Sequence, residues 1–83
     1  MKLLKDILYK VSIDKIVGST NIAIESIQFD SRNVEKFSLF VAVSGTQVDG
    51  HLFIERAIES GAHAVVCERL PEQTVDSITY VLV

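Results

Sequence analysis

Three kinds of side chain in this sequence could do chemistry: a thiol, two imidazoles, and a group of charged and hydroxyl side chains in one short segment. A cysteine nucleophile needs a nearby base, and the chain offers one cysteine, Cys67, with His51 and His63. Cys67 lies inside the apolar run AVVC, where a small buried thiol is the usual role. We therefore expect no catalytic residue and no enzymatic activity from this chain by itself.

Metal and nucleotide motifs can be tested directly against the sequence. Paired CxxC or HxxxH spacings, which bring metal ligands together, do not occur. The phosphate-binding P-loop requires a Gly-Lys pair before Ser or Thr, and the chain contains neither this pair nor a GxGxxG pattern. The sequence predicts no metal site and no cofactor within these residues.

The remaining chemistry is concentrated in the segment FDSRNVEKFSLFVAVSGTQVDGH, from Phe29 to His51. Ser31 supplies a hydroxyl and Arg32 a forked cation, and both are suited to a phosphate. The turn from Gly45 to Gly50 can present backbone N–H groups where a helix begins. These groups together favour a phosphate-binding role.

A purely structural interpretation fits the same residues. Asp30 and Arg32 can tie their loop to the sheet, and Asp49 can cap the following helix. From the residues alone, ligand binding and loop bracing stay open as equal alternatives.

The elements that must position this segment follow from hydrophobic spacing. Helical spacing of the apolar residues predicts a helix over residues 2–10. The stretch IAIESIQFD alternates in apolar character, with a change of register at Ser26, and predicts a strand that ends near Asp30. The uncharged run SLFVAVS, residues 38–44, is typical of a strand covered on both faces, and we expect it to be central.

The second half of the chain has the pattern of strand, helix and strand. Residues 51–60 have helical spacing and are followed by Gly61 at the position of a C-terminal cap. AHAVVCE and ITYVLV predict two further strands, separated by a loop that contains Pro71. We predict an α/β domain with a small mixed, partly parallel sheet of about four strands and at least two helices. If the strands ending near Asp30 and Ser44 are parallel neighbours, their loops emerge at one edge.

Composition narrows the class of protein. A chain of 83 residues with 48% apolar residues has room for a single folded domain. Its net charge of −3, with the basic residues scattered singly, argues against nucleic acid or a membrane as a partner. The N-terminus lacks the apolar run of a signal peptide, and one cysteine excludes an internal disulfide, so we expect a cytoplasmic location. The final apolar run SITYVLV leads us to expect the first domain, residues 1–83, of a longer protein.

Four motifs, FDSRNV, LFVAVSG, DGHLFIERAIESGA and AVVCE, stand in this order over roughly residues 22–68. In this arrangement the chain resembles the N-terminal domain of the Mur ligases. The preceding LLKDIL is more similar to the MurE branch, the UDP-N-acetylmuramoyl-tripeptide synthetases, than to the MurF branch. The resemblance implies a three-domain ligase of peptidoglycan precursor synthesis whose central domain uses ATP and Mg²⁺. It also implies that this domain holds the UDP end of UDP-N-acetylmuramoyl-peptide and contacts the central and C-terminal domains of its own chain.

The resemblance assigns residues to this role position by position. The residues that match the family's UDP contacts are Phe29, Ser31, Thr46, Gln47 and Val48. The residues that match the motifs but are expected to shape the loops are Asp30, Arg32, Gly45, Asp49 and His51. Where the family has a Gly-Asp turn this sequence has Phe37 and Ser38, which leaves the geometry of that turn open. Two alternatives remain open. The chain could be the N-terminal domain of MurF or of a related amide ligase, or a stand-alone regulatory or interaction domain of the same fold.

Overall fold

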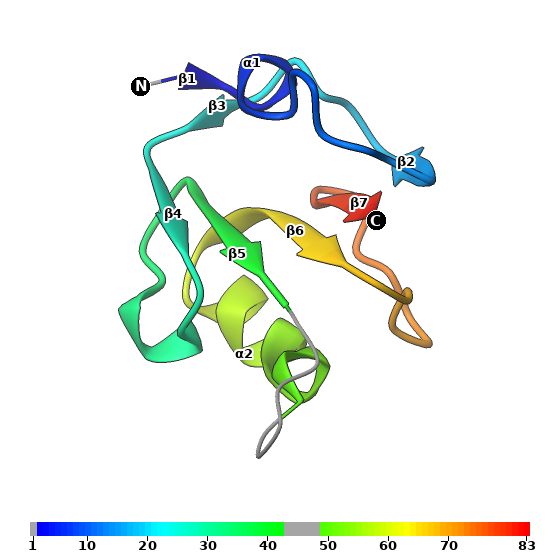
Figure 1. The fold of residues 1–83 in the computed structure, drawn as a ribbon. Helices are drawn as coiled ribbons and strands as arrows, with labels where there is room; N and C mark the ends of the chain where they lie inside the picture. Colours follow the sequence, from blue (N-terminus) through cyan, green and yellow to red (C-terminus); the bar gives the residue numbers. More distant parts are fainter. Residues whose placement is uncertain (1, 43–48) are drawn as a thin grey trace.

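A five-stranded mixed sheet forms the centre of the molecule in the computed structural model, which describes residues 2–42 and 49–83 (Figure 1). Its strands, in spatial order, are β2 (Lys15–Val17), β7 (Thr79–Leu82), β6 (Ala62–Cys67), β5 (Ser38–Val41) and β4 (Ser26–Gln28). β4, β5, β6 and β7 are parallel, and β2 is antiparallel to β7. The predicted mixed, partly parallel α/β sheet is confirmed, and so is the parallel pairing of β4 with β5.

Each face of the sheet is covered by its own layer (Figure 1). On one face lie two 3₁₀ turns, η1 (Ser31–Asn33) and η2 (Gly50–Phe53), and helix α2 (Ile54–Glu59). They enclose a cluster that includes Phe40, Val65 and Tyr80. On the other face lie α1 (Leu4–Ile7) and a two-stranded ribbon of β1 (Lys2–Leu3) and β3 (Ala23–Ile24). Alternate residues of the inner strands therefore enter two separate cores, as period-two geometry requires.

β5 is buried along most of its length and β6 is the middle strand of the five. The apolar run at β5 was therefore correctly predicted to be covered on both faces, although it lies one position from the centre. The connection from β5 through α2 to β6 returns to a parallel neighbour. α2 ends before Gly61, which has a φ of 114° and whose missing Cβ would lie 2.9 Å from the backbone of Lys36. Gly61 thus ends the helix as predicted and also permits this close approach.

The predicted helix over residues 2–10 is wrong in its extent. Helical structure covers only Leu4–Ile7, and β1 precedes it. The N–H groups of Leu4 and Lys5 donate to the carbonyls of Ile22 and Thr20, at 2.8 and 3.0 Å, so the start of the segment belongs to the ribbon. Lys10 has a φ of 67°, which ends the helical path.

The single strand predicted up to Asp30 is two strands. β3 pairs with β1 in the covering layer, whereas β4 pairs with β5 in the main sheet. The chain changes layer at Glu25, whose N–H donates to the carbonyl of Phe37 at 2.8 Å. The register change at Ser26 marked this crossing. A separate strand, β2, was missed because its three residues run into a turn-forming sequence.

The turn before β5 keeps a glycine-like backbone without a glycine. Phe37 has a φ of 63°, in the left-handed region that glycine adopts most readily. Its ring meets that of His63 edge-on, with centroids 5.5 Å apart. The hydroxyl of Ser38 accepts the N–H of Glu35 at 3.0 Å and lies 2.9 Å from the hydroxyl of Ser26, which joins the turn to β4. Neighbouring contacts therefore hold the turn in a strained conformation.

Candidate functional site

The candidate site lies where the parallel strands end. Gln28 of β4 pairs with Phe40, Val41 of β5 pairs with Val66, and Cys67 of β6 pairs with Leu82, so these strands finish at one edge of the sheet. The predicted residues Phe29 to Arg32 follow β4 at this edge. Gly45, Thr46, Gln47 and Val48 lie outside the described residues, and their predicted roles stay predictions.

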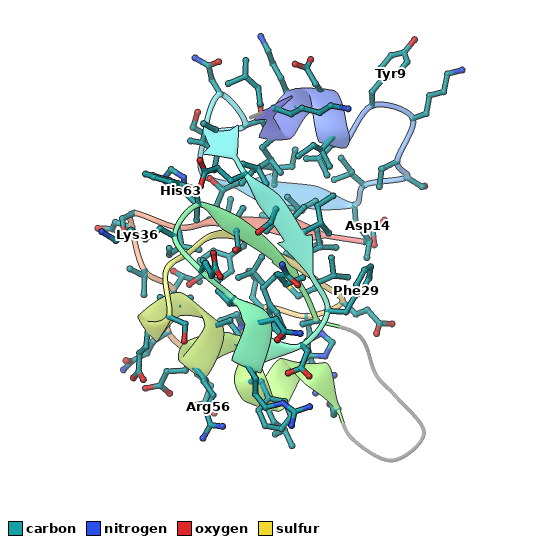
Figure 2. The ribbon with its side chains drawn as sticks, turned by 90° about the vertical axis from the view of Figure 1, so that its left-hand side faces the viewer. Tyr9, Asp14, Phe29, Lys36, Arg56 and His63 are labelled. Atoms are coloured by element: carbon teal, nitrogen blue, oxygen red, sulfur yellow. The ribbon has the colours of Figure 1, made fainter. Side chains whose placement is uncertain are left out.

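Phe29 and Ser31, the two described residues predicted to touch the ligand, differ in accessibility. Phe29 is 70% exposed and projects from the end of β4 (Figure 2). Ser31 begins η1 and is only 7% exposed. An exposed aromatic ring can stack on a planar group. A ligand can reach Ser31 only at the small part of its surface that remains accessible.

Asp30 and Arg32, on either side of Ser31, form a corner held by hydrogen bonds between the two residues. The Asp30 carboxylate accepts the backbone N–H of Arg32 at 2.9 Å and two guanidinium N–H groups at 2.7 and 3.1 Å. The side-chain hydrogen bond from Arg32, followed by its backbone hydrogen bond, lowers the pKa of Asp30 to about 2. Asp30 in turn raises the pKa of the guanidinium. The Arg32 side chain is 80% exposed, so the pair stays in solvent.

Asp49 forms a second corner, at the start of η2. Its carboxylate accepts the backbone N–H of His51 at 2.9 Å and lies 2.7 Å from Nδ1 of the same residue. The other imidazole nitrogen, Nε2, is 2.9 Å from the backbone nitrogen of Glu68. Because a backbone N–H can only donate, Nε2 accepts, and this network assigns the remaining proton to Nδ1. The imidazole is 5% exposed and bridges the two segments.

Arg69 completes this corner from a distant part of the chain. Its guanidinium donates to the second carboxylate oxygen of Asp49, across 20 positions of sequence. Hydrogen bonds from Arg69, then from the backbone and the side chain of His51, hold the pKa of Asp49 well below its usual range. Sequence reasoning missed Glu68 and Arg69, because no local spacing connects them with η2.

The other chemistry-bearing residues lie away from this arrangement. Cys67 is buried, and burial raises the pKa of its thiol, which disfavours the reactive thiolate. His63 lies on β6, where Nδ1 is 3.3 Å from the carbonyl of Ala23. Within residues 2–42 and 49–83, no three His, Cys, Asp or Glu side chains gather as metal ligands. In the same part of the chain no helix is long and apolar enough to cross a bilayer.

Two grooves open elsewhere on the surface. One of about 490 Å³ lies between α2 and residues 71–75, with Glu55, Glu59 and Glu72 in its lining. Another of about 610 Å³ lies between α1 and the start of β4. Neither is lined by a residue that the sequence predicted for ligand binding.

The sequence of this chain is similar to those of known ligases. The sequence model described as "Mur ligase family, catalytic domain" matches residues 23–81. A "UDP-N-acetylmuramoyl-L-alanyl-D-glutamate--2,6-diaminopimelate ligase" of Phocaeicola vulgatus is 47% identical over 80 residues, 96% of this chain and 16% of its own length. A ligase of the same name from Cytophaga hutchinsonii is 54% identical over 69 residues, 83% of this chain and 14% of its own length. The chain therefore spans less than a fifth of each of these relatives.

Solved structures of similar fold include two MurF ligases. MurF from Acinetobacter baumannii superposes with a TM-score of 0.64 and 28% identity, over 72% of this chain and 13% of that one. MurF ligase from Thermotoga maritima, solved in complex with ADP, gives a TM-score of 0.60 and 37% identity, over 65% and 12% of the two chains.

Proposed function

This chain belongs to the Mur ligase family, and we propose that it binds the UDP end of UDP-N-acetylmuramoyl-peptide during peptidoglycan precursor synthesis. The proposal rests above all on one observation, that β4, β5 and β6 are parallel and end at a common edge. Open α/β sheets bind ligands at the carboxyl ends of their strands. Both segments predicted to contact UDP follow strands that end there.

The described residues offer chemistry that suits a nucleotide. Phe29 presents an accessible ring at this edge, which can stack on a uracil. Ser31, two residues further along, offers a hydroxyl to the diphosphate or the sugar. The predicted contacts of Thr46, Gln47 and Val48 with UDP belong to the same proposal. Arg32 and Arg69, the two arginines near this edge, each already donate to an aspartate, so the proposed site relies mainly on neutral donors.

ATP and Mg²⁺, which the family uses, do not fit the residues of this chain. The sequence contains no Gly-Lys pair for a P-loop, and the described carboxylates and histidines form no group of metal ligands. We therefore propose that this domain binds the substrate and does not catalyse the ligation. ATP-dependent ligation would belong to other domains of a longer protein, with which this chain would share the substrate.

The curated relatives favour the MurE branch over the MurF branch for that longer protein. Relatives at 47% and 54% identity are named as 2,6-diaminopimelate ligases, whereas the MurF structures share 28% and 37%. We infer that the longer protein adds 2,6-diaminopimelate to UDP-N-acetylmuramoyl-L-alanyl-D-glutamate, in the cytoplasm where such precursors are made.

A titration followed by NMR tests the binding proposal. UDP added to the ¹⁵N-labelled chain is expected to shift the amides of Ser31 and Gln47, with weak affinity because the other domains are absent. Phe29→Ala should weaken this binding, while Tyr9→Ala, which removes another exposed ring, should not. No shift at millimolar UDP would contradict the proposal and favour a regulatory or interaction domain.

A further inference from the structure

The outer edge of the main sheet, at β4, is open to a further strand. In spatial order β4 is the last strand of the five, and in the main sheet it pairs only with β5. Figure 1 shows β4 at the margin of the sheet, and Figure 2 looks onto this margin. Within residues 2–42 and 49–83, no backbone hydrogen bond joins β4 to an element other than β5. The N–H and C=O groups on the outer side of such an edge strand are available to pair with another chain.

The two edges of the sheet differ in how they are protected. Natural edge strands often carry lysine, proline or a bulge, which hinder pairing with a second chain. β2, at the opposite edge, begins with Lys15. β4 consists of Ser26, Ile27 and Gln28, with no charge and no proline, and its register with β5 is regular. Of the two edges, that of β4 is therefore better suited to pairing, although three residues make only a small contact.

Apolar side chains accompany the open edge. Ile27, the middle residue of β4, is 46% exposed, and Phe29, just after the strand, is 70% exposed. The groove of about 610 Å³ adjoins this edge, and its lining includes Ile7, Ile24 and Ile27. A strand paired with β4 would bring its own side chains beside this lining and remove apolar surface from water. The edge thus offers backbone hydrogen bonds and apolar contacts to the same occupant.

We propose that this edge binds the β4 edge of a second copy of the chain, antiparallel, about a two-fold axis at Ile27. The inference goes beyond the proposed function and does not depend on it. Two-fold dimers that use the same patch on both copies are the commonest assemblies of identical chains. In this register Ile27 lies opposite Ile27 of the second copy, and Ser26 lies opposite Gln28.

The sequence around β4 is self-complementary in this register. Glu25 lies opposite Phe29 of the second copy, so no like charges face each other. Directly opposite residues of antiparallel strands share a face, so the two Ile27 side chains meet. The lining of the adjoining groove carries one cation, Lys2, together with Asp6 and Glu25. A parallel pairing in register would instead place the two Glu25 carboxylates opposite each other, which favours the antiparallel arrangement.

Sedimentation velocity over a range of chain concentrations tests the association. Because the paired strands are short, we expect a weak, reversible dimer with a dissociation constant of about 0.1 to 1 mM. Each copy has a net charge of −3, so added salt screens the repulsion between copies and should strengthen the dimer. An interface held by ion pairs would respond to salt in the opposite direction.

Ile27→Lys tests whether the contact lies at β4. This change places two lysines opposite each other and should raise the dissociation constant at least about tenfold. Ile16→Lys is the matched control, because Ile16 is the middle residue of the other edge strand, is 37% exposed and gives the same change in net charge. The control should leave the dissociation constant unchanged. Circular dichroism and the midpoint of thermal unfolding establish that both variants are folded.

Ile27→Cys tests the register. Directly opposite residues have Cβ atoms about 5 Å apart, so oxidised glutathione should link two copies through the introduced thiols. Each disulfide formed reduces one glutathione disulfide to two thiols. The native thiol of Cys67 is buried and leaves this reaction undisturbed. Gln28→Cys, whose position lies opposite Ser26 of the second copy, should give far less linked dimer.

Three results would overturn the inference. A chain that sediments as a monomer at about 1 mM would exclude a second copy as the occupant of this edge. Equal weakening by Ile27→Lys and Ile16→Lys would place the contact elsewhere on the molecule. Equal cross-linking of Ile27→Cys and Gln28→Cys would refute the antiparallel register centred on Ile27.

Discussion

At two places on the carboxyl edge an aspartate accepts the N–H two residues further on, at 2.9 Å in both corners. In both, the side chain at that later position also bonds the same carboxylate. Around Asp30 the contacts end there, with the Arg32 side chain in solvent. Around Asp49 they continue through a nearly enclosed imidazole to Glu68, and through Arg69.

The same local hydrogen-bond pattern therefore contributes differently to stability at the two aspartates. An aspartate that accepts an N–H at i+2 shapes a turn wherever it occurs. Only the Asp49 corner also joins elements that are distant in sequence, and the imidazole that joins them is nearly enclosed. Contacts of that second kind contribute more to stability, because the imidazole that makes them is itself buried and removing it also removes its packing.

The largest expected effect is from His51→Ala. Removing the nearly enclosed imidazole deletes its hydrogen bonds to Asp49 and Glu68 and opens a space beside η2, so we expect a loss of about 2 kcal/mol in the free energy of unfolding. Urea unfolding followed by circular dichroism measures this. Arg32→Ala, the matched change in the exposed corner, should have no measurable effect. Equal losses in the two variants would break the comparison.

A third turn, at Phe37, has no aspartate and tests whether backbone strain can be separated from side-chain contacts. Phe37→Gly and Phe37→Ala both remove the ring contact with His63, but only glycine relieves the positive φ. We expect the Gly variant to be more stable than the Ala variant by about 1 kcal/mol, the cost of the left-handed region. Thermal unfolding of the two variants gives the difference. An Ala variant as stable as the Gly variant would mean that the turn relaxes to negative φ.

The smallest expected effect is on the dependence of stability on pH. Both aspartates have a pKa below the usual value near 3.8 in the folded chain, about 2 for Asp30 and lower for Asp49. Their contribution is therefore complete above pH 4 and is lost as the pH falls through the folded values. Asp49→Asn should flatten the acid side of the stability curve more than Asp30→Asn, measured by urea unfolding between pH 2 and pH 5. The reverse order would show that Asp30 has the stronger native partners.

The inner strands β5, β6 and β7 and the parallel βαβ unit could be predicted because their causes are local. Apolar runs identified β5 and β6, and Gly61 identified the end of α2. The split of the first strand was only half visible, as a register change at Ser26. Its physical cause, the crossing between layers at Glu25, depends on the carbonyl of Phe37.

The candidate site also has features that the sequence predicted and features that it did not. The sequence did not predict that Phe29 is exposed and Ser31 buried, because both residues belong to one motif and were assigned the same role. Asp30 and Arg32 bond each other, as two residues so close in the chain readily do. The partners of His51 and Asp49 were out of reach because Glu68 and Arg69 lie beyond an intervening helix and strand.

By itself the sequence determined the class of fold and the family motifs, and it predicted two segments that we propose bind a nucleotide, because spacing and residue type act over a few positions. Only the tertiary structure decided how far α1 extends, where the chain changes layer, and that the Asp49 corner is fastened to the end of β6. Those features depend on hydrogen bonds between residues far apart along the chain, which form only once the layers have packed together. The contacts of Asp49 and His51 also need parallel strands whose ends lie at the same edge.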